Sequence, residues 1–169
     1  MSRDASKALH FEQIGPEHIE ELTTLFERNR MSAVTEMFDP FPLDAAQARK
    51  IALHGGEDAF YLARSDKLAV GFSMLRGFDE GYAIPSFGIF VDRESQGWGV
   101  GRKLTAWTIE QARAGGCPAV RLTVYAANVA ACRLYESLGF VELERQSVER
   151  LGRREEKIVM RVDFGGRDE

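Results

Sequence analysis

Cysteine and long apolar runs are both scarce in this chain of 169 residues. Its two cysteines, Cys117 and Cys132, do not form a C-x-x-C pair, and the opening MSRDASKALHF has no apolar segment of the kind that directs secretion. No stretch approaches the roughly 18 consecutive apolar residues that a membrane-spanning helix needs. We therefore expect a cytoplasmic protein with free thiols, without a disulfide framework and without a membrane partner.

Histidine is also scarce, and positive charge is not in excess. The three histidines, His10, His18 and His54, show no metal-ligand spacing, so we expect no metal ion. Lysine and arginine number 22 against 26 acidic residues, which gives a net charge of −4 and a pI of about 5.5. Because a nucleic-acid-binding protein usually presents a strongly basic face, we expect no nucleic-acid partner.

Length and patterning predict one mixed α/β domain over residues 1–169, with flexible tails at 1–7 and 165–169. Strands are predicted at 8–14, in a hairpin over 58–77 with its turn at 65–67, at 81–91 interrupted by Pro85, and at 119–124. Two further strands are predicted after the last helix, the second of them at 155–164. Helices are predicted at 16–30, from Asp44 to the glycines at 55 and 56, at 99–114 with Val100, Leu104, Trp107 and Gln111 on one face, and at 128–139. The segment 31–42 breaks the helical period and contains two prolines, so it is predicted to be a loop.

Three glycines, Gly97, Gly99 and Gly101, occupy alternate positions between a predicted strand and a predicted helix. A dinucleotide fingerprint would need glycine at Arg102, and a P-loop would need serine or threonine directly after Lys103, so neither motif fits. The first N–H groups of a helix are unsatisfied and its dipole favours an anion. We therefore expect this loop to bind a phosphate group rather than to be a turn without a ligand.

Two motifs in order resemble the GNAT superfamily of N-acetyltransferases. The first is Gln96-x-x-Gly99-x-Gly101 after the strand-like SFGIFV, and the second is LTVYAANVAACRLYESLGF, residues 122–140. The resemblance implies a central mixed, mostly antiparallel sheet flanked by helices on both faces. It also implies acetyl-CoA as co-substrate, entering where the sheet splays between the strand that ends near Val91 and the strand at 120–125.

The resemblance assigns roles to particular residues. It implies that backbone N–H groups wrap the CoA pyrophosphate at Gln96, Gly97, Trp98, Gly99, Val100, Gly101 and Arg102. It implies that Ile89, Phe90 and Val91 offer backbone groups to the pantetheine arm and the thioester carbonyl. Asn128 would lie near the pantetheine, besides capping its helix. Tyr135 would protonate the leaving thiolate; the alternative is a core aromatic beside Ala131 and Leu138, and the LYESLGF setting favours the catalytic role.

The general base and the amine acceptor stay open at the level of sequence. The strand before the glycine loop lacks the acidic residue that many relatives carry; substitutes are Glu36, Asp39, Asp79, Glu80, or water relayed from Ser86 or Tyr82. Phe38, Asp39 and Phe41 either border the acceptor site or pack on the sheet. Cys132 could act as a covalent nucleophile, but the sequence favours a role as a small core residue.

The acceptor class expected is a small-molecule or peptide amine, and homodimerisation is left open. Three other functions compete: a non-catalytic acyl-CoA-binding sensor, an acyltransferase that uses a different acyl-CoA, and a nucleotide-binding protein. The failed P-loop and dinucleotide spacings argue against the last of these.

Overall fold

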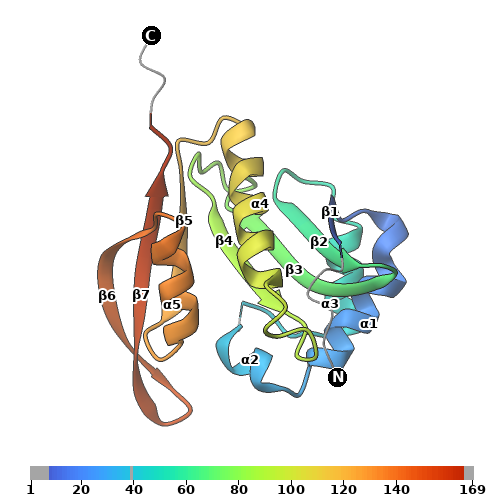
Figure 1. The fold of residues 1–169 in the computed structure, drawn as a ribbon, viewed down its shortest axis with the longest axis horizontal. Helices are drawn as coiled ribbons and strands as arrows, with labels where there is room; N and C mark the ends of the chain where they lie inside the picture. Colours follow the sequence, from blue (N-terminus) through green and yellow to red (C-terminus); the bar gives the residue numbers. More distant parts are fainter. Residues whose placement is uncertain (1–7, 39, 166–169) are drawn as a thin grey trace.

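A computed structural model describes residues 8–38 and 40–165. Within these residues seven strands form one sheet in the order β1-β2-β3-β4-β5-β7-β6 (Figure 1). The strands are β1 (Leu9–Gln13), β2 (Ala59–Ser65), β3 (Leu68–Arg76), β4 (Ser86–Val91), β5 (Ala119–Tyr125), β6 (Val141–Arg150) and β7 (Arg153–Asp163). The helices are α1 (Ile19–Asn29, after a 3₁₀ turn at Pro16–His18), α2 (Ala33–Met37), α3 (Ala45–Ala52), α4 (Val100–Ala114) and α5 (Val129–Ser137).

All neighbouring strands are antiparallel except β4 and β5, which run parallel. These two strands pair only at Ser86 and Arg121, next to a hydrogen bond from the Arg121 N–H to the Pro85 carbonyl at 3.0 Å. Beyond this point β4 and β5 separate. The predicted splay of the sheet between these strands is therefore confirmed.

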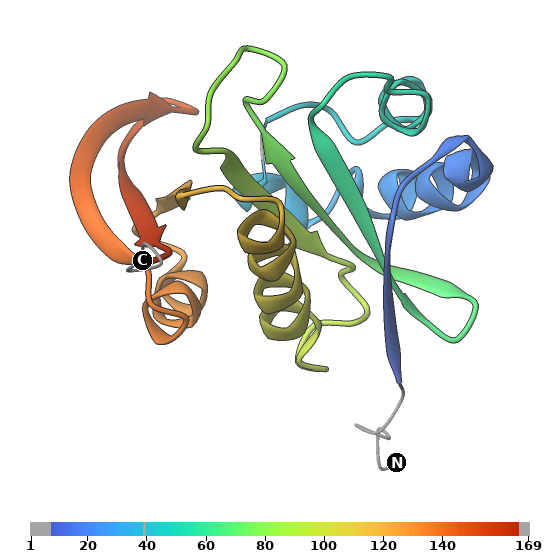
Figure 2. The same cartoon turned by 90° about the horizontal axis from the view of Figure 1, so that it is seen from above.

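Helices cover both faces of the sheet (Figure 2). On one face α1 and α3 pack on β2, β3 and β4 through a core rich in phenylalanine. On the opposite face α4 and α5 pack on the sheet through a second apolar cluster that includes Ile109, Val120 and Tyr135. The predicted fold class, a mostly antiparallel mixed sheet with helices on both faces, is confirmed.

Three sequence predictions are corrected. Residues 31–42 contain the short helix α2, because Ser32 caps it by accepting the Val34 N–H at 3.3 Å. The strand predicted from 81 begins only at Ser86, since the residues before it form the β3–β4 loop. The buried face of α4 is broader than predicted: Val100, Leu104 and Trp107 pack in one apolar cluster as expected, and Thr105, Thr108, Ile109 and Ala112 are buried as well.

The other predicted elements match within a few residues, including the β2–β3 hairpin and the Asp44 cap, whose carboxylate accepts the Gln47 N–H at 2.8 Å. The predicted tail 1–7 and residues 166–169 of the C-terminal tail lie outside the described residues. No helix in the described part of the chain has both the length and the apolarity to span a membrane.

Candidate active site

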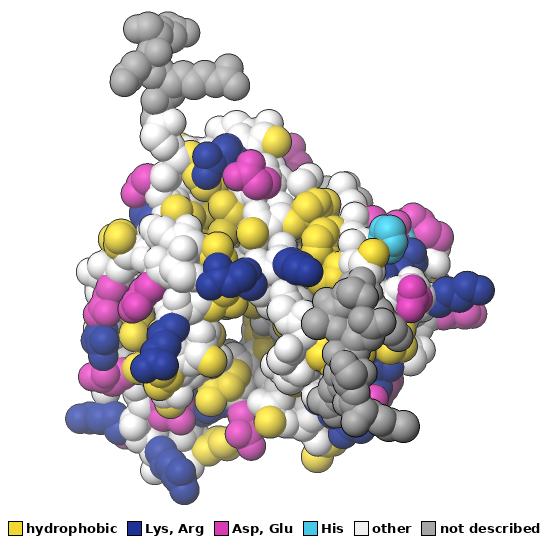
Figure 3. Space-filling view, viewed as in Figure 1, with side chains coloured by type: hydrophobic (Ala, Val, Ile, Leu, Met, Phe, Trp, Pro, Cys, Tyr) yellow, Lys and Arg dark blue, Asp and Glu magenta, His cyan; other side chains and the backbone are white. Residues whose placement is uncertain are grey.

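A cleft of about 1380 Å³ lies where β4 and β5 separate. Figure 3 shows an opening between the part of the molecule that carries α5 and the part that carries α4, with hydrophobic side chains around it. Most of the wall comes from β4, β5, α2, α5 and the β3–β4 loop, residues 77–85, with single residues or pairs from β3, the β4–α4 loop, α4 and β7. Of the residues assigned to acetyl-CoA by resemblance, the cleft is lined by Ile89, Phe90, Val91, Gln96, Gly101, Asn128 and Tyr135.

The glycine loop presents a row of free backbone donors at the start of α4. Gly97 and Gly99 have φ of +81° and +79°, values that L-residues with a side chain rarely adopt. Among the described residues, no acceptor is hydrogen-bonded to the N–H groups of Gln96, Gly97, Gly99, Val100, Gly101 and Arg102. The Trp98 N–H donates to the Ser95 carbonyl at 3.3 Å. Six free donors at a helix N-terminus form a site that suits a phosphate.

Asp92 holds this loop in place from the end of β4. Its side chain is fully buried and accepts hydrogen bonds from Arg28 Nε at 2.8 Å and Asn29 Nδ2 at 2.9 Å, both on α1. Asn29 Oδ1 in turn accepts the Arg93 N–H at 2.9 Å. The position of the loop is therefore set by a polar contact with α1 on the other side of the sheet.

Gly101 lies where α4 comes closest to the cleft. A Cβ placed on Gly101 would be 3.6 Å from Val91 Cγ2 and 3.8 Å from Leu134 Cδ2. A side chain at this position would therefore contact both Val91 of β4 and Leu134 of α5, which line the cleft.

Helix α5 places Asn128 and Tyr135 on the same wall of the cleft, as their spacing of two helical turns predicts. Asn128 Oδ1 caps the helix by accepting the Ala131 N–H at 3.3 Å. Its capping role is thus present, and its Nδ2 group is not hydrogen-bonded within the described part of the chain.

Tyr135 is 7% exposed and packs edge-on against Phe87 and Phe140, with ring centroids 6.2 Å and 5.7 Å apart. Burial, with a smaller contribution from Cys132, raises the pKa of the Tyr135 hydroxyl above its ordinary value. Among the described residues the hydroxyl has no hydrogen-bond partner. The core and acid roles are therefore both compatible with its position, because the ring is packed while the residue lines the cleft.

Cys132 is placed for packing rather than for nucleophilic attack. It is half-buried, it is not part of the cleft wall, and its Sγ contacts the Tyr125 carbonyl at 3.7 Å. Burial raises the pKa of the Cys132 thiol, which lowers the fraction of reactive thiolate at neutral pH.

The open candidates for the base separate in the structure. Glu80, Tyr82 and Ser86 line the cleft, and Glu80 is its one carboxylate among the described residues. Glu36 is on α2 but not in the cleft wall, and Asp39 lies outside the described residues.

The two phenylalanines of the α2–α3 segment serve mainly in packing. Phe38 and Phe41 contact each other and Phe72, and Phe38 also contacts Phe90 at 5.1 Å between ring centroids. Phe38 is nevertheless part of the cleft wall, whereas Phe41 is not.

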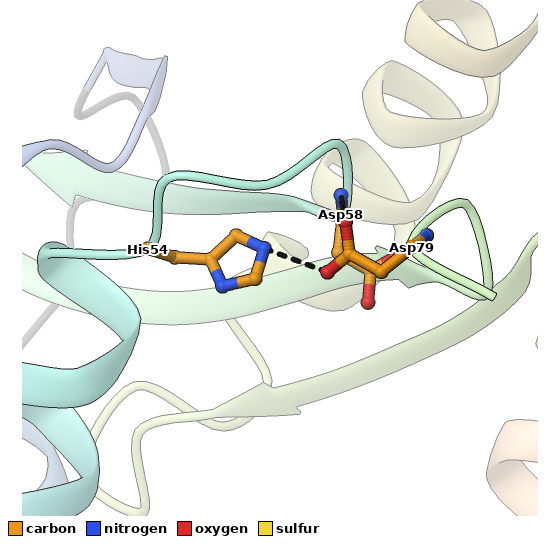
Figure 4. A group of neighbouring side chains, drawn as sticks. All are labelled: His54, Asp58 and Asp79. Atoms are coloured by element: carbon orange, nitrogen blue, oxygen red, sulfur yellow. Dashed lines mark hydrogen bonds and ion pairs between the residues drawn. The ribbon is translucent and has the colours of Figure 1, made fainter.

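Asp79 belongs to a polar clip that joins the α3–β2 connection to the β3–β4 loop (Figure 4). Asp58 Oδ1 accepts the N–H groups of Gly77, Phe78 and Asp79 at 2.9, 2.9 and 3.2 Å. Asp79 Oδ1 accepts the Glu57 N–H at 2.6 Å, and Asp79 Oδ2 lies 2.9 Å from His54 Nε2. The Glu57 N–H is the main cause of a lowered Asp79 pKa. These bonds indicate that Asp79 shapes the cleft wall rather than acting as the base.

Asp58→Ala is expected to destabilise the fold, because it leaves three N–H groups of the β3–β4 loop without their acceptor. The expected loss in the free energy of unfolding is about 1–3 kcal/mol, the cost of an unsatisfied buried polar group. Urea unfolding followed by circular dichroism measures this loss. Glu57→Ala is the matched control, since the exposed Glu57 side chain makes no hydrogen bond or ion pair within the described residues. Equal midpoints for the two variants would refute the role of Asp58.

Sequence reasoning missed four cations in the cleft wall, Arg76, Arg93, Arg121 and Lys157. They come from four separate parts of the chain, so no local motif brings them together. Strand alternation predicts that Arg121 lies on the face opposite its buried neighbours Val120 and Leu122. Its neighbour on that face, Ser86, follows only from the pairing of β4 with β5.

Comparison with known proteins matches this architecture to one family. The Acetyltransferase (GNAT) family profile matches residues 19–140. A mycothiol acetyltransferase of Nocardiopsis dassonvillei is 37% identical over 107 residues, 63% of this chain and 30% of the relative. The [ribosomal protein bS18]-alanine N-acetyltransferase of Escherichia coli K12 is 40% identical over 76 residues, 44% of this chain and 51% of the relative.

The matched region thus spans about half or less of these curated relatives. Among solved structures, a putative acetyltransferase from Salmonella typhimurium with its cofactor acetyl-CoA superposes with a TM-score of 0.73 at 19% identity, covering 96% of this chain and 97% of that one. That likeness shows the shared fold. Since the family profile covers most of the chain and includes both sequence motifs, the chain belongs to the GNAT family of acetyltransferases.

Proposed function

We propose that this protein transfers an acetyl group from acetyl-CoA to a primary amine by direct attack. The observation that carries the proposal is the set of six free N–H groups at the start of α4, next to the gap between β4 and β5. These donors suit the pyrophosphate, and the cleft suits the pantetheine arm. In this arrangement Gln96 to Arg102 bind the phosphates, and Ile89 to Val91 and Asn128 line the arm.

The backbone of β4 supplies a candidate oxyanion site. The Pro85 carbonyl points toward β5, as its bond to the Arg121 N–H shows. Because alternate residues of a strand direct their backbone groups to the same side, Ile89, four residues on, directs its groups toward the gap. We assign the Ile89 N–H to stabilise the negative charge that develops on the thioester carbonyl oxygen.

Tyr135 is the proposed acid. The amine nitrogen bonds to the thioester carbon, the C–S bond breaks, and the departing thiolate shares the Tyr135 proton through a hydrogen bond. The raised pKa keeps the hydroxyl protonated at neutral pH. Because a thiol has a pKa of about 8.5, full transfer is uphill, and the hydroxyl acts mainly by hydrogen-bonding the developing thiolate. We assign Glu80, through water, to receive the proton that the amine loses.

Ligand-induced thermal shifts test the binding half of this proposal. We expect acetyl-CoA and CoA to raise the melting temperature, and ATP and NAD to leave it nearly unchanged. Release of free thiol from acetyl-CoA with a panel of amines tests the catalytic half. Binding of acetyl-CoA without turnover on any amine would favour a non-catalytic sensor, and a shift with ATP or NAD alone would refute the assignment of the cleft.

A further inference from the structure

The strand register places two arginines of the cleft in one row across the sheet. Arg76 of β3 pairs with Ser86 of β4, and Ser86 pairs with Arg121 of β5. Residues that pair directly across strands have their side chains on the same face. The row lies at the closed end of the gap, where β4 and β5 are still paired.

The face of this row follows from its neighbours along β3. Phe72 and Met74, which precede Arg76 by four and two residues, belong to the core beneath α1 and α3. Arg76, Ser86 and Arg121 therefore lie on the α1–α3 side of the sheet, opposite α4 and α5. The cleft residues from α2, Ala33, Val34 and Met37, belong to the same side, since Val34 packs against that core.

The two arginines have no acidic partner among the described residues. Arg76 is half-buried and Arg121 is exposed, and neither makes an ion pair or a side-chain hydrogen bond in this part of the chain. By contrast, the next residue of the row, Arg161 of β7, is bonded to Asp163 at 2.6 Å. A half-buried guanidinium without a partner is unfavourable, so this end of the cleft is suited to an incoming anion.

The phosphates of CoA are not that anion. Their proposed site is at the other end of β4, and five residue steps of strand separate Ser86 from Val91 by roughly 16 Å. The Cα atoms of Arg76 and Arg121 are about 10 Å apart, two strand spacings, so the long side chains can converge on one group above Ser86. The cleft thus has two separate ends that suit an anion, the N–H groups at the start of α4 and the arginines on either side of Ser86.

We propose that the acceptor is a small primary amine that carries an anionic group, a carboxylate or a phosphate, held by Arg76 and Arg121 with the Ser86 hydroxyl between them. This inference rests on the proposed acetyl transfer. The anion at the closed end of the gap anchors the acceptor on the α1–α3 side, while its amine reaches the thioester farther along β4. Lys157, a half-buried cation on the β7 wall, adds positive potential to the same cleft.

The test compares amines that differ only in the anion. One arm sets glycine, β-alanine and 5-aminopentanoate against their amides, and the other sets O-phosphoethanolamine against ethanolamine. We expect the anionic member of at least one arm to have a kcat/KM at least about tenfold higher. The responding arm identifies carboxylate or phosphate. Arg76→Gln and Arg121→Gln should each raise KM for that acceptor about tenfold or more, with kcat and acetyl-CoA affinity nearly unchanged.

Arg49→Gln is the matched control, because Arg49 is an exposed arginine of α3 outside the cleft wall. Turnover that prefers the neutral members, or that is insensitive to both cleft substitutions, would overturn the anionic acceptor while leaving acetyl transfer intact. If acetyl-CoA neither binds nor turns over, the proposed function itself fails. Calorimetry of the same anionic amines, without a cofactor, then decides: no binding, or binding unaffected by Arg121→Gln, refutes the anion site.

Discussion

Replacing Gly99 with valine is expected to lower the affinity for acetyl-CoA by at least about tenfold. Gly99 has φ of +79°, and a Cβ there would meet no described atom within 4 Å. The cost is therefore backbone strain rather than a clash, about 1–2 kcal/mol for an L-residue in this region and more for a β-branched one. A loop that relaxes to relieve the strain turns its N–H groups away from the pyrophosphate, and calorimetry measures the lost affinity.

Gly152→Val separates strain from binding. Gly152 is in the β6–β7 turn with φ of +72°, and a Cβ there would also meet no described atom within 4 Å. It therefore carries a comparable strain outside the cleft. Gly152→Val should reduce stability and leave the affinity for acetyl-CoA unchanged. Equal affinities for the parent protein and Gly99→Val would show that the loop does not bind the pyrophosphate.

Tyr135→Phe is expected to reduce turnover about 100-fold or more, with little change in the affinity for acetyl-CoA. The substitution keeps the ring and its contacts with Phe87 and Phe140, and removes only the hydroxyl. Since the hydroxyl has no partner among the described residues, the stability of the fold should change little. Because burial raises the Tyr135 pKa, turnover should not fall through ionisation of this group between pH 7 and about 9.

Tyr61→Phe is the matched control for this prediction. Tyr61 is a buried tyrosine of β2 that is not part of the cleft wall, and its pKa is also raised by burial. Its loss of a hydroxyl should leave turnover near the parent value. Parental turnover in Tyr135→Phe would mean that water or another group protonates the thiolate and that Tyr135 only packs.

Local chemistry explains which parts could be predicted from the sequence. The caps at Asp44 and Asn128 and the hairpin turn near Asp66 depend on residues that are neighbours in the chain, and the structure has them where they were predicted. The splay between β4 and β5 followed from the family resemblance and was also confirmed.

Long-range contacts explain what was missed. Helix α2 is only five residues long, which is too short for a helical periodicity of apolar residues to be recognised in the sequence. From the sequence, Asp79 is expected to be a solvated charge in a loop. In the structure its N–H donates to Asp58 and its carboxylate pairs with His54, which are distant in the chain. Arg76, Ser86 and Arg121 lie in one row because of the register of three strands. Strand register cannot be predicted from composition or from the spacing of residues.

A crystal structure of the complex with acetyl-CoA tests the central claim most directly. The account predicts the pyrophosphate within hydrogen-bond distance of the N–H groups at Gln96–Arg102, the pantetheine between β4 and β5, and the thioester sulfur near the Tyr135 hydroxyl. Acetyl-CoA bound elsewhere, with β4 and β5 hydrogen-bonded along their whole length, would contradict it.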